Sequence, residues 1–237
     1  MTGPEQLEPD LGALGALADR SRRAVYRVVC EAGAEAVSRD DVAAALGVGR
    51  TLAAFHLDKL VDAGLLEVSF ARRTGRAGPG AGRTAKLYRR SATEHTVTVP
   101  PRAYHRVAEL LAEAVERTAA DATLFAVARE RGRAQARAQA PARDRPRRAR
   151  QARQAGIDDL VRALTEDGYE PVAGPDTVML RNCPFHLLAE QFPPLVCGMN
   201  LALVEGLVQG LGVTGWSAAT DPVPGHCCVR ISKSNQD

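Results

Sequence analysis

Two short helical segments joined by a glycine turn restrict the fold of this chain more than any other pattern. Ser38 is a good N-cap residue for the first segment, which ends at Gly47. After the turn Gly47-Val48-Gly49, apolar residues recur at helical spacing from Arg50 to Ala63 and stop at Gly64. Two short helices in this order predict a helix-turn-helix, in which the first helix braces the second.

The flanking segments complete a winged version of this fold. Apolar residues at near-helical spacing predict one amphipathic helix over Leu11–Ala32. Beyond Gly64, alternating residues over 66–70 and again over 84–88 predict two strands of a hairpin. The segment Arg72–Arg90 contains six Arg, one Lys and no acidic residue. We therefore expect a winged helix-turn-helix domain over residues 1–95, with a basic wing.

A basic hairpin beside a helix-turn-helix predicts double-stranded DNA as the partner, whereas the net charge of +3 alone is weak evidence for it. Side chains at the start of the second helix can reach base edges, and wing cations hold the backbone or the minor groove. The candidate DNA contacts are Arg50, Thr51, His56, Lys59, Arg73, Arg76, Arg83 and Lys86. The alternative is that these are amphipathic helices of another small domain.

The segment GVGRTLAAFHLDKLVDAGLLEV resembles the recognition helix and wing entry of the ArsR-like winged helix-turn-helix regulators. The resemblance covers residues 11–90 and implies a transcription regulator.

The middle of the chain predicts a linker helix. Residues 100–120 place apolar side chains on one helical face, which suits a homodimer contact or packing within the C-terminal domain. The following segment Arg129–Arg153 has ten Arg among Ala, Gln and two prolines, which is typical of a solvated, partly disordered linker.

The C-terminal segment 121–237 predicts a compact α+β sensor domain with two or three strands, so the whole chain is expected to be α+β and mainly helical. Strands are expected over Thr177–Asn182 and Cys228–Ile231. A stripe of small residues, Gly198, Ala202, Gly206 and Gly210, predicts close approach of a helix to its neighbour.

Four of the five cysteines lie in the last quarter of the chain, and they are Cys183, Cys197, Cys227 and Cys228. The odd number, without an export signal, favours free thiols or metal binding over disulfides. Pro184 follows Cys183 directly, which places this thiol at a predicted helix N-terminus and lowers its expected pKa; Cys197 falls early in its own helix. Cys30 lies on the apolar side of the first predicted helix and is expected to be buried in the hydrophobic core.

The segments NCPFHLLAEQFPPLVCGMN and PGHCC resemble the sensor of the SufR-type iron-sulfur regulators, a branch of the ArsR-like proteins. The resemblance implies that Cys183, Cys197 and one of Cys227 or Cys228 bind an iron-sulfur cluster of the 4Fe-4S kind. The family's upstream cysteine is missing, so the fourth ligand stays open. The candidates are Glu170, Asp176, His186, His226, the second cysteine of the pair and an exogenous ligand.

Several alternatives to the cluster remain at this point. Three thiolates with a histidine would suit zinc equally well, and a metal-free thiol redox switch or inert buried cysteines also fit. Alternation along the last strand predicts that only one of Cys227 and Cys228 binds.

A cysteine nucleophile beside His186 is disfavoured, because no acid that would orient the histidine is evident, so no enzyme activity is expected. The chain has no apolar run that could span a bilayer, and a cytoplasmic protein is expected. The pattern as a whole predicts a homodimeric DNA-binding regulator, with a repressor favoured, whose cysteines sense iron-sulfur or redox status. The alternative is a DNA-binding protein with no ligand.

Overall fold

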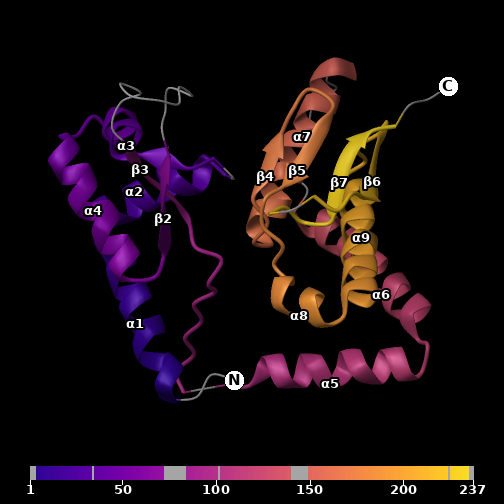
Figure 1. Cartoon of the computed structure of the whole chain (residues 1–237). Coiled ribbons are helices and arrows are strands. Elements are labelled where there is room, and N and C mark those ends of the chain that lie inside the picture. The colour runs from indigo at the N-terminus through magenta and orange to yellow at the C-terminus, as the bar shows by residue number, and fades with distance from the viewer. Residues whose placement is uncertain are drawn as a thin grey trace. The chain divides into compact units, whose positions relative to one another are not determined.

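The computed structural model describes residues 4–33, 35–71, 84–100, 102–139, 149–223 and 225–234. The chain divides into two compact units, residues 1–102 and 103–237 (Figure 1). The prediction of an α+β, mainly helical fold is confirmed.

The described residues of the first unit form four helices and a small antiparallel sheet whose strand order is β1-β3-β2 (Figure 1). Its elements are α1 (Pro4–Ala18), α2 (Arg20–Glu31), β1 (Val37–Ser38), α3 (Arg39–Leu46), α4 (Arg50–Asp62), β2 (Leu66–Ala71) and β3 (Ala85–Arg90). The core of this unit includes Val25 and Val29 of α2, Leu57 and Leu60 of α4, and Tyr88 of β3.

The first helical segment is not the single helix expected over Leu11–Ala32. Asp19 leaves the helical conformation and caps α2, because its side chain accepts a hydrogen bond from the backbone N–H of Arg22 at 2.8 Å. Asp at this position stabilises a new helix start, so α1 ends at Ala18.

The second unit places helices against a four-stranded antiparallel sheet whose order is β4-β5-β7-β6. Its elements are α5 (Tyr104–Arg117), α6 (Asp121–Gln139), α7 (Ala149–Glu166), β4 (Pro171–Ala173), β5 (Thr177–Leu180), α8 (His186–Gln191), α9 (Pro193–Gly210), β6 (Trp216–Thr220) and β7 (Val229–Lys233). Val178 lies opposite Ile231 in the register of β5 and β7, and both are buried on the sheet face against which helices pack.

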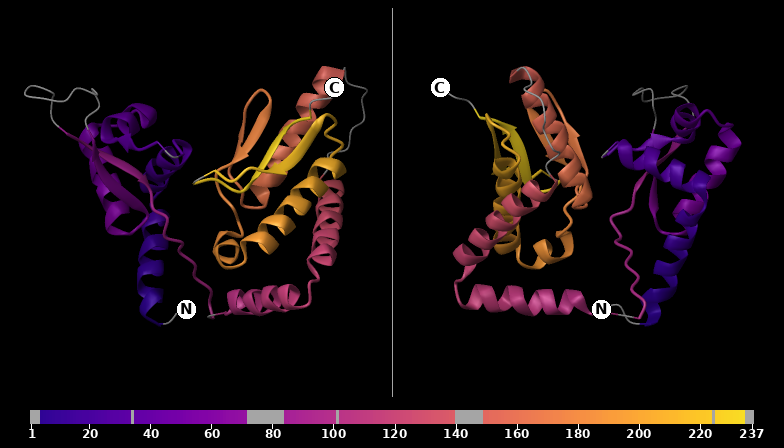
Figure 2. Two further views of the ribbon diagram at one scale, coloured as in Figure 1. Left: turned by 45° about the vertical axis from the view of Figure 1, so that its right-hand side comes forward. Right: turned by 180° about the vertical axis from the view of Figure 1, so that it is seen from behind.

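The small-residue stripe of α9 brings this helix against α6, as predicted. The two helices run alongside each other in both views of Figure 2. A Cβ atom on Gly206 would lie 2.2 Å from the carbonyl oxygen of Arg129, and one on Gly132 would lie 2.2 Å from that of Leu203. Only glycine permits this approach of two backbones.

The structure corrects two expectations in the second unit. The start of the arginine-rich segment is helical, because α6 continues to Gln139 and buries Gly132 and Ala136. Residues 140–148 lie outside the described part of the chain. The sheet has four strands among the described residues, since β4 and β6 add to the two strands that the sequence indicated.

Candidate functional site

The helix-turn-helix is built from α3 and α4. Ser38 and Asp41 form a capping box that starts α3: the Ser38 backbone N–H donates to the Asp41 carboxylate at 2.9 Å, and the Asp41 N–H donates to Ser38 Oγ at 3.3 Å. Gly47 ends α3 with a φ of +64°, and Gly49 is the N-cap of α4. Arg50 is therefore the first helical residue of α4, as expected.

The first predicted DNA contacts on α4 are exposed. Thr51 is exposed, and the Arg50 side chain is 73% exposed, with its Nε 3.3 Å from a carboxylate oxygen of Asp40 on α3. Lys59 is also exposed and forms an ion pair with Asp62, 3.2 Å away, one turn further along α4. Exposed ion pairs of this kind are weak, so both cations can exchange their carboxylates for DNA phosphates.

The structure corrects the prediction that His56 contacts DNA, because this side chain is buried. Only 9% of this residue is exposed, and its Nδ1 atom is buried without a hydrogen-bond partner among the described residues. The outward positions of α4 belong instead to Leu52 and Phe55, which are 46% and 52% exposed. Both belong to the apolar residues whose helical spacing over 50–63 predicted this helix, and that spacing placed them on its buried side.

The structure describes the two strands of the wing, β2 and β3, but not residues 72–83 between them. Lys86 of β3 lies 2.5 Å from the Asp58 carboxylate of α4, and Tyr88 donates a hydrogen bond to the same carboxylate at 3.0 Å. Burial raises the pKa of Asp58, but the hydrogen bonds from Lys86 and Tyr88 outweigh it and hold that pKa below its ordinary value. A contact between Lys86 and a DNA phosphate must therefore compete with the ion pair between Lys86 and Asp58.

The other three predicted wing contacts, Arg73, Arg76 and Arg83, lie outside the described residues.

Four cysteines from three separate segments meet in the second unit. Cys183 follows β5, Cys197 lies on α9, and Cys227 with Cys228 directly precede β7. Cys183, Cys227 and Cys228 pack in one core cluster, and the thiols lie close enough that Cys227 shifts the pKa values of Cys183 and Cys228, and Cys197 contributes to the shift of Cys228. The strand begins only at Val229, so strand alternation does not decide how the adjacent Cys227 and Cys228 are oriented.

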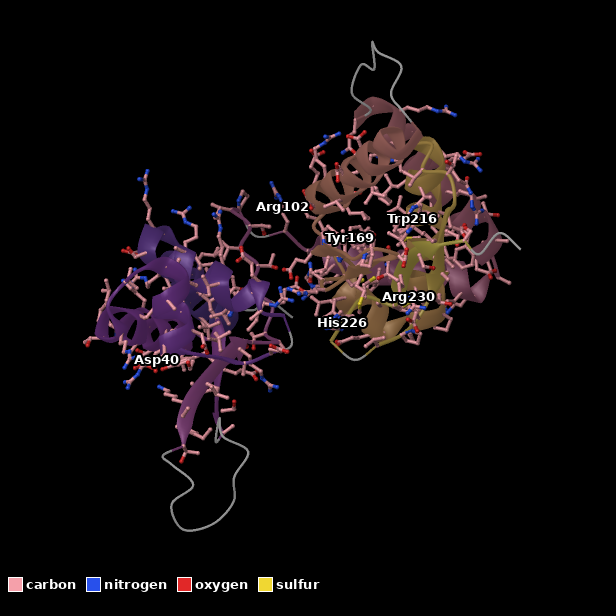
Figure 3. All side chains as sticks on the ribbon, turned by 90° about the horizontal axis from the view of Figure 1, so that it is seen from above. Asp40, Arg102, Tyr169, Trp216, His226 and Arg230 are labelled. Carbon is pink, nitrogen blue, oxygen red and sulfur yellow. The ribbon has the colours of Figure 1, made fainter. Side chains whose placement is uncertain are left out.

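A buried carboxamide faces these thiols. Asn200 of α9 is fully buried, and its Nδ2 lies 3.2 Å from the sulfur of Cys227 and 4.0 Å from that of Cys183. The hydroxyl of Tyr169 donates a hydrogen bond to Asn200 Oδ1, which fixes the amide with its NH₂ group toward sulfur. Tyr169 is labelled in Figure 3, and sulfur atoms appear there in yellow.

The thiol pKa values differ from those predicted for helix N-termini. Helix α8 begins at His186 rather than at Pro184, and hydrogen bonding to Cys227 together with burial raises the pKa of Cys183. The pKa of Cys227 is instead far below its ordinary value, because Cys183 and Cys228 donate to its sulfur, as do the Val229 backbone N–H and Asn200. Cys227 therefore loses its proton more readily than Cys183 or Cys228.

Other proposed ligands have partners elsewhere. Asp176 is paired with Lys233, and His186 Nε2 lies 3.2 Å from a carboxylate oxygen of Glu190 at the surface. Among the candidates for a fourth ligand, the second cysteine of the pair packs against the same core cluster as Cys183. Within the described ranges, no three or more His, Cys, Asp or Glu residues form a group that could hold a metal ion as the side chains stand.

Comparison with known families concerns the first unit. Residues 17–69 match the family model of a helix-turn-helix domain. No curated protein matches the chain. No helix in the described part of the chain is long and apolar enough to cross a membrane. The matched residues include all of α2, α3 and α4, so the chain carries a helix-turn-helix domain, and this domain supports a role as a DNA-binding transcriptional regulator.

Proposed function

We propose that the protein is a homodimeric DNA-binding repressor in which Cys183, Cys197, Cys227 and Cys228 hold an iron-sulfur cluster that controls operator binding. The observation that carries this proposal is the meeting of four thiols from three segments of the second unit. Iron-sulfur clusters are held by four cysteine thiolates, so the donor set fits the group.

The surroundings of the thiols also fit a charged sulfur site. Asn200 donates toward two of the sulfurs, and hydrogen bonds to sulfur stabilise negative charge and tune the reduction potential of a cluster. The thiols must lose their protons before the sulfurs can bind metal, and the low pKa of Cys227 favours this step at that residue. Small side-chain rotations would then replace thiol contacts by metal contacts.

Binding at these four positions would connect segments that are far apart in the chain. The loop after β5, the middle of α9 and the entry to β7 would be held at one point, so loss of the ligand would release all three. An iron-sulfur cluster would supply sensitivity to oxidants and to iron supply. A coupling of about 1 to 3 kcal/mol between the two sites is enough to change operator affinity 5- to 150-fold.

The test uses the full chain purified without oxygen, with duplex DNA selected from a random pool as its operator. We expect a brown protein with visible absorption, bound iron and acid-labile sulfide. Cys183→Ser and Cys197→Ser should remove the colour and change operator affinity together. Cys30→Ser is the matched control, because Cys30 is a half-buried residue of α2 in the other unit and should affect neither property.

The adjacent pair gives a separate expectation. Both Cys227→Ser and Cys228→Ser should lose the cluster, since each thiol contacts another member of the group. Loss of colour in only one of them would mean that the fourth ligand is not a cysteine. A colourless Cys183→Ser protein with wild-type operator affinity in every redox state would contradict the coupling.

Two other sensors fit the same thiols. Zinc takes four thiolates in a tetrahedral structural site, and metal analysis of the same sample would show zinc without iron or sulfide. A metal-free switch is favoured by the contact of Cys183 with Cys227. Hydrogen peroxide would take two electrons and two protons from these thiols, leaving one disulfide and two water molecules. Mass spectrometry of the oxidised, metal-free protein would detect that disulfide.

A further inference from the structure

Two large apolar side chains are exposed on the helix that the fold offers to DNA. Leu52 and Phe55 of α4 are 46% and 52% exposed, whereas Ala53, Leu57 and Leu60 of the same helix are fully buried. Phe55 lies one turn from Thr51 on one side and from Lys59 on the other, so it is at the centre of the outward face. About half of each large apolar residue therefore stays exposed to water, which a contact with an apolar partner group would remove.

The surroundings of this apolar pair match DNA better than an apolar protein surface. The first two turns of α4 contain Arg50 and no acidic residue before Asp58. Asp58 itself is engaged by Lys86 and Tyr88. A helix N-terminus attracts phosphate, and the second helix of a helix-turn-helix meets base edges with its N-terminal residues.

We propose that Leu52 and Phe55 form an apolar reader of thymine, with Phe55 contacting the 5-methyl group of a thymine in the major groove. The methyl group of thymine is the apolar feature of the groove floor, and phenylalanine is one of the side chains that contacts it. Sequence preference at that position then comes from exclusion of water between two apolar groups rather than from hydrogen bonds. This inference rests on the proposed DNA-binding function.

The experiment removes only the methyl group. The full chain selects its operator from random duplex DNA, and each thymine of that operator is then replaced by deoxyuridine. At one thymine in each half-site, the replacement should weaken wild-type binding about 4-fold, the change that corresponds to about 0.8 kcal/mol for one buried methyl-sized group. Replacement of other thymines should have little effect.

The protein variant tests the same contact from the other side. Phe55→Ala should bind the thymine and deoxyuridine operators equally, so the two changes should not add. Leu14→Ala is the matched control: Leu14 is 45% exposed on α1, outside the helix-turn-helix and the wing, and its loss should leave the preference for thymine intact. Circular dichroism checks that both variants are folded. Because both side chains are exposed, the change to Ala is expected to leave the fold intact.

The outcomes separate the inference from the function on which it rests. Operator binding with no thymine preference at any position, or with a preference that survives in Phe55→Ala, overturns the thymine contact and leaves the regulator proposal standing. A Phe55→Ala variant whose molar mass by light scattering falls from dimer to monomer would assign the patch to a second copy of the chain. Absence of any DNA binding by the wild-type protein overturns both proposals.

Discussion

At the scale of single residues, Asn200 connects the hydroxyl of Tyr169 to the thiol of Cys227 inside the second unit. Its carboxamide accepts a hydrogen bond from Tyr169 and donates toward Cys227, and no part of it is exposed. A buried polar group that loses its partner costs about 1 to 3 kcal/mol, whereas removal of both partners costs less than the sum of the two changes. The Tyr169–Asn200 pair should therefore behave as one unit in stability.

We expect Asn200→Leu and Tyr169→Phe each to lower the free energy of unfolding by about 1 to 3 kcal/mol. The double variant should lose less than the two single losses together. The measurement is urea unfolding of reduced, chelator-treated protein, followed by the fluorescence of Trp216. This residue is the single Trp of the chain and lies in β6, so its signal reports on the second unit. Strict additivity of the two changes would contradict the pairing.

At the scale of elements, the crossing of α6 and α9 gives the second unit its tightest contact. Arg129 of α6 lies 2.6 Å from the carboxylate of Glu205 on α9 at a partly exposed position, and this pair flanks the glycine contact. The contact places α9, and with it Cys197 and Asn200, at a set distance from α6. Any side chain at the glycine positions must push the two backbones apart.

Gly206→Ala should destabilise the second unit by about 1 to 3 kcal/mol or more, the usual cost of overpacking. Gly156→Ala on α7 is the control, because its Cβ would make an ordinary contact with Val213 at 3.5 Å. Removal of a helical glycine at that position should be neutral or stabilise by up to about 1 kcal/mol. Both values come from the same Trp216 unfolding experiment. Equal effects of the two substitutions would show that the helices can separate at little cost.

At the scale of the whole molecule, α5 leaves several large apolar side chains exposed. Tyr104, Leu110 and Leu111 are 71%, 67% and 62% exposed. The charged residues of the helix include Arg106 and Glu109 in its first half and an ion pair between Glu113 and Arg117 in its second. The exposed apolar side chains are therefore where we place the contact of the proposed dimer.

If the proposed dimer forms through α5, the double change Leu110→Glu and Leu111→Glu should convert it to a monomer, because it would place like charges on the apolar face. Operator affinity should fall at the same time, since two half-sites would no longer be bound together. Light scattering and DNA titration measure the two effects. Glu116→Gln, at an exposed polar position of the same helix, should leave the molar mass unchanged. A dimer that survives the double change would place the interface elsewhere.

The sequence by itself determined the local structure of the helix-turn-helix. Ser38, Gly47 and Gly64 act through backbone conformation and capping within a few residues, so their positions predicted where α3 begins and where α3 and α4 end. The same holds for the small-residue stripe of α9, because side-chain size alone decides how closely another backbone can approach.

Only the tertiary structure decided which side chains of α4 face outward. The helical spacing alone did not decide which of Leu52, Phe55 and His56 is buried, and the packing of α2 and β2 against α4 buried the histidine and left the two apolar residues exposed. Tertiary structure likewise joined the four cysteines and placed Asn200 beside them. These residues are brought together by the pairing of β5 with β7 and the packing of α9 on the sheet, which are contacts between distant segments that no local pattern contains.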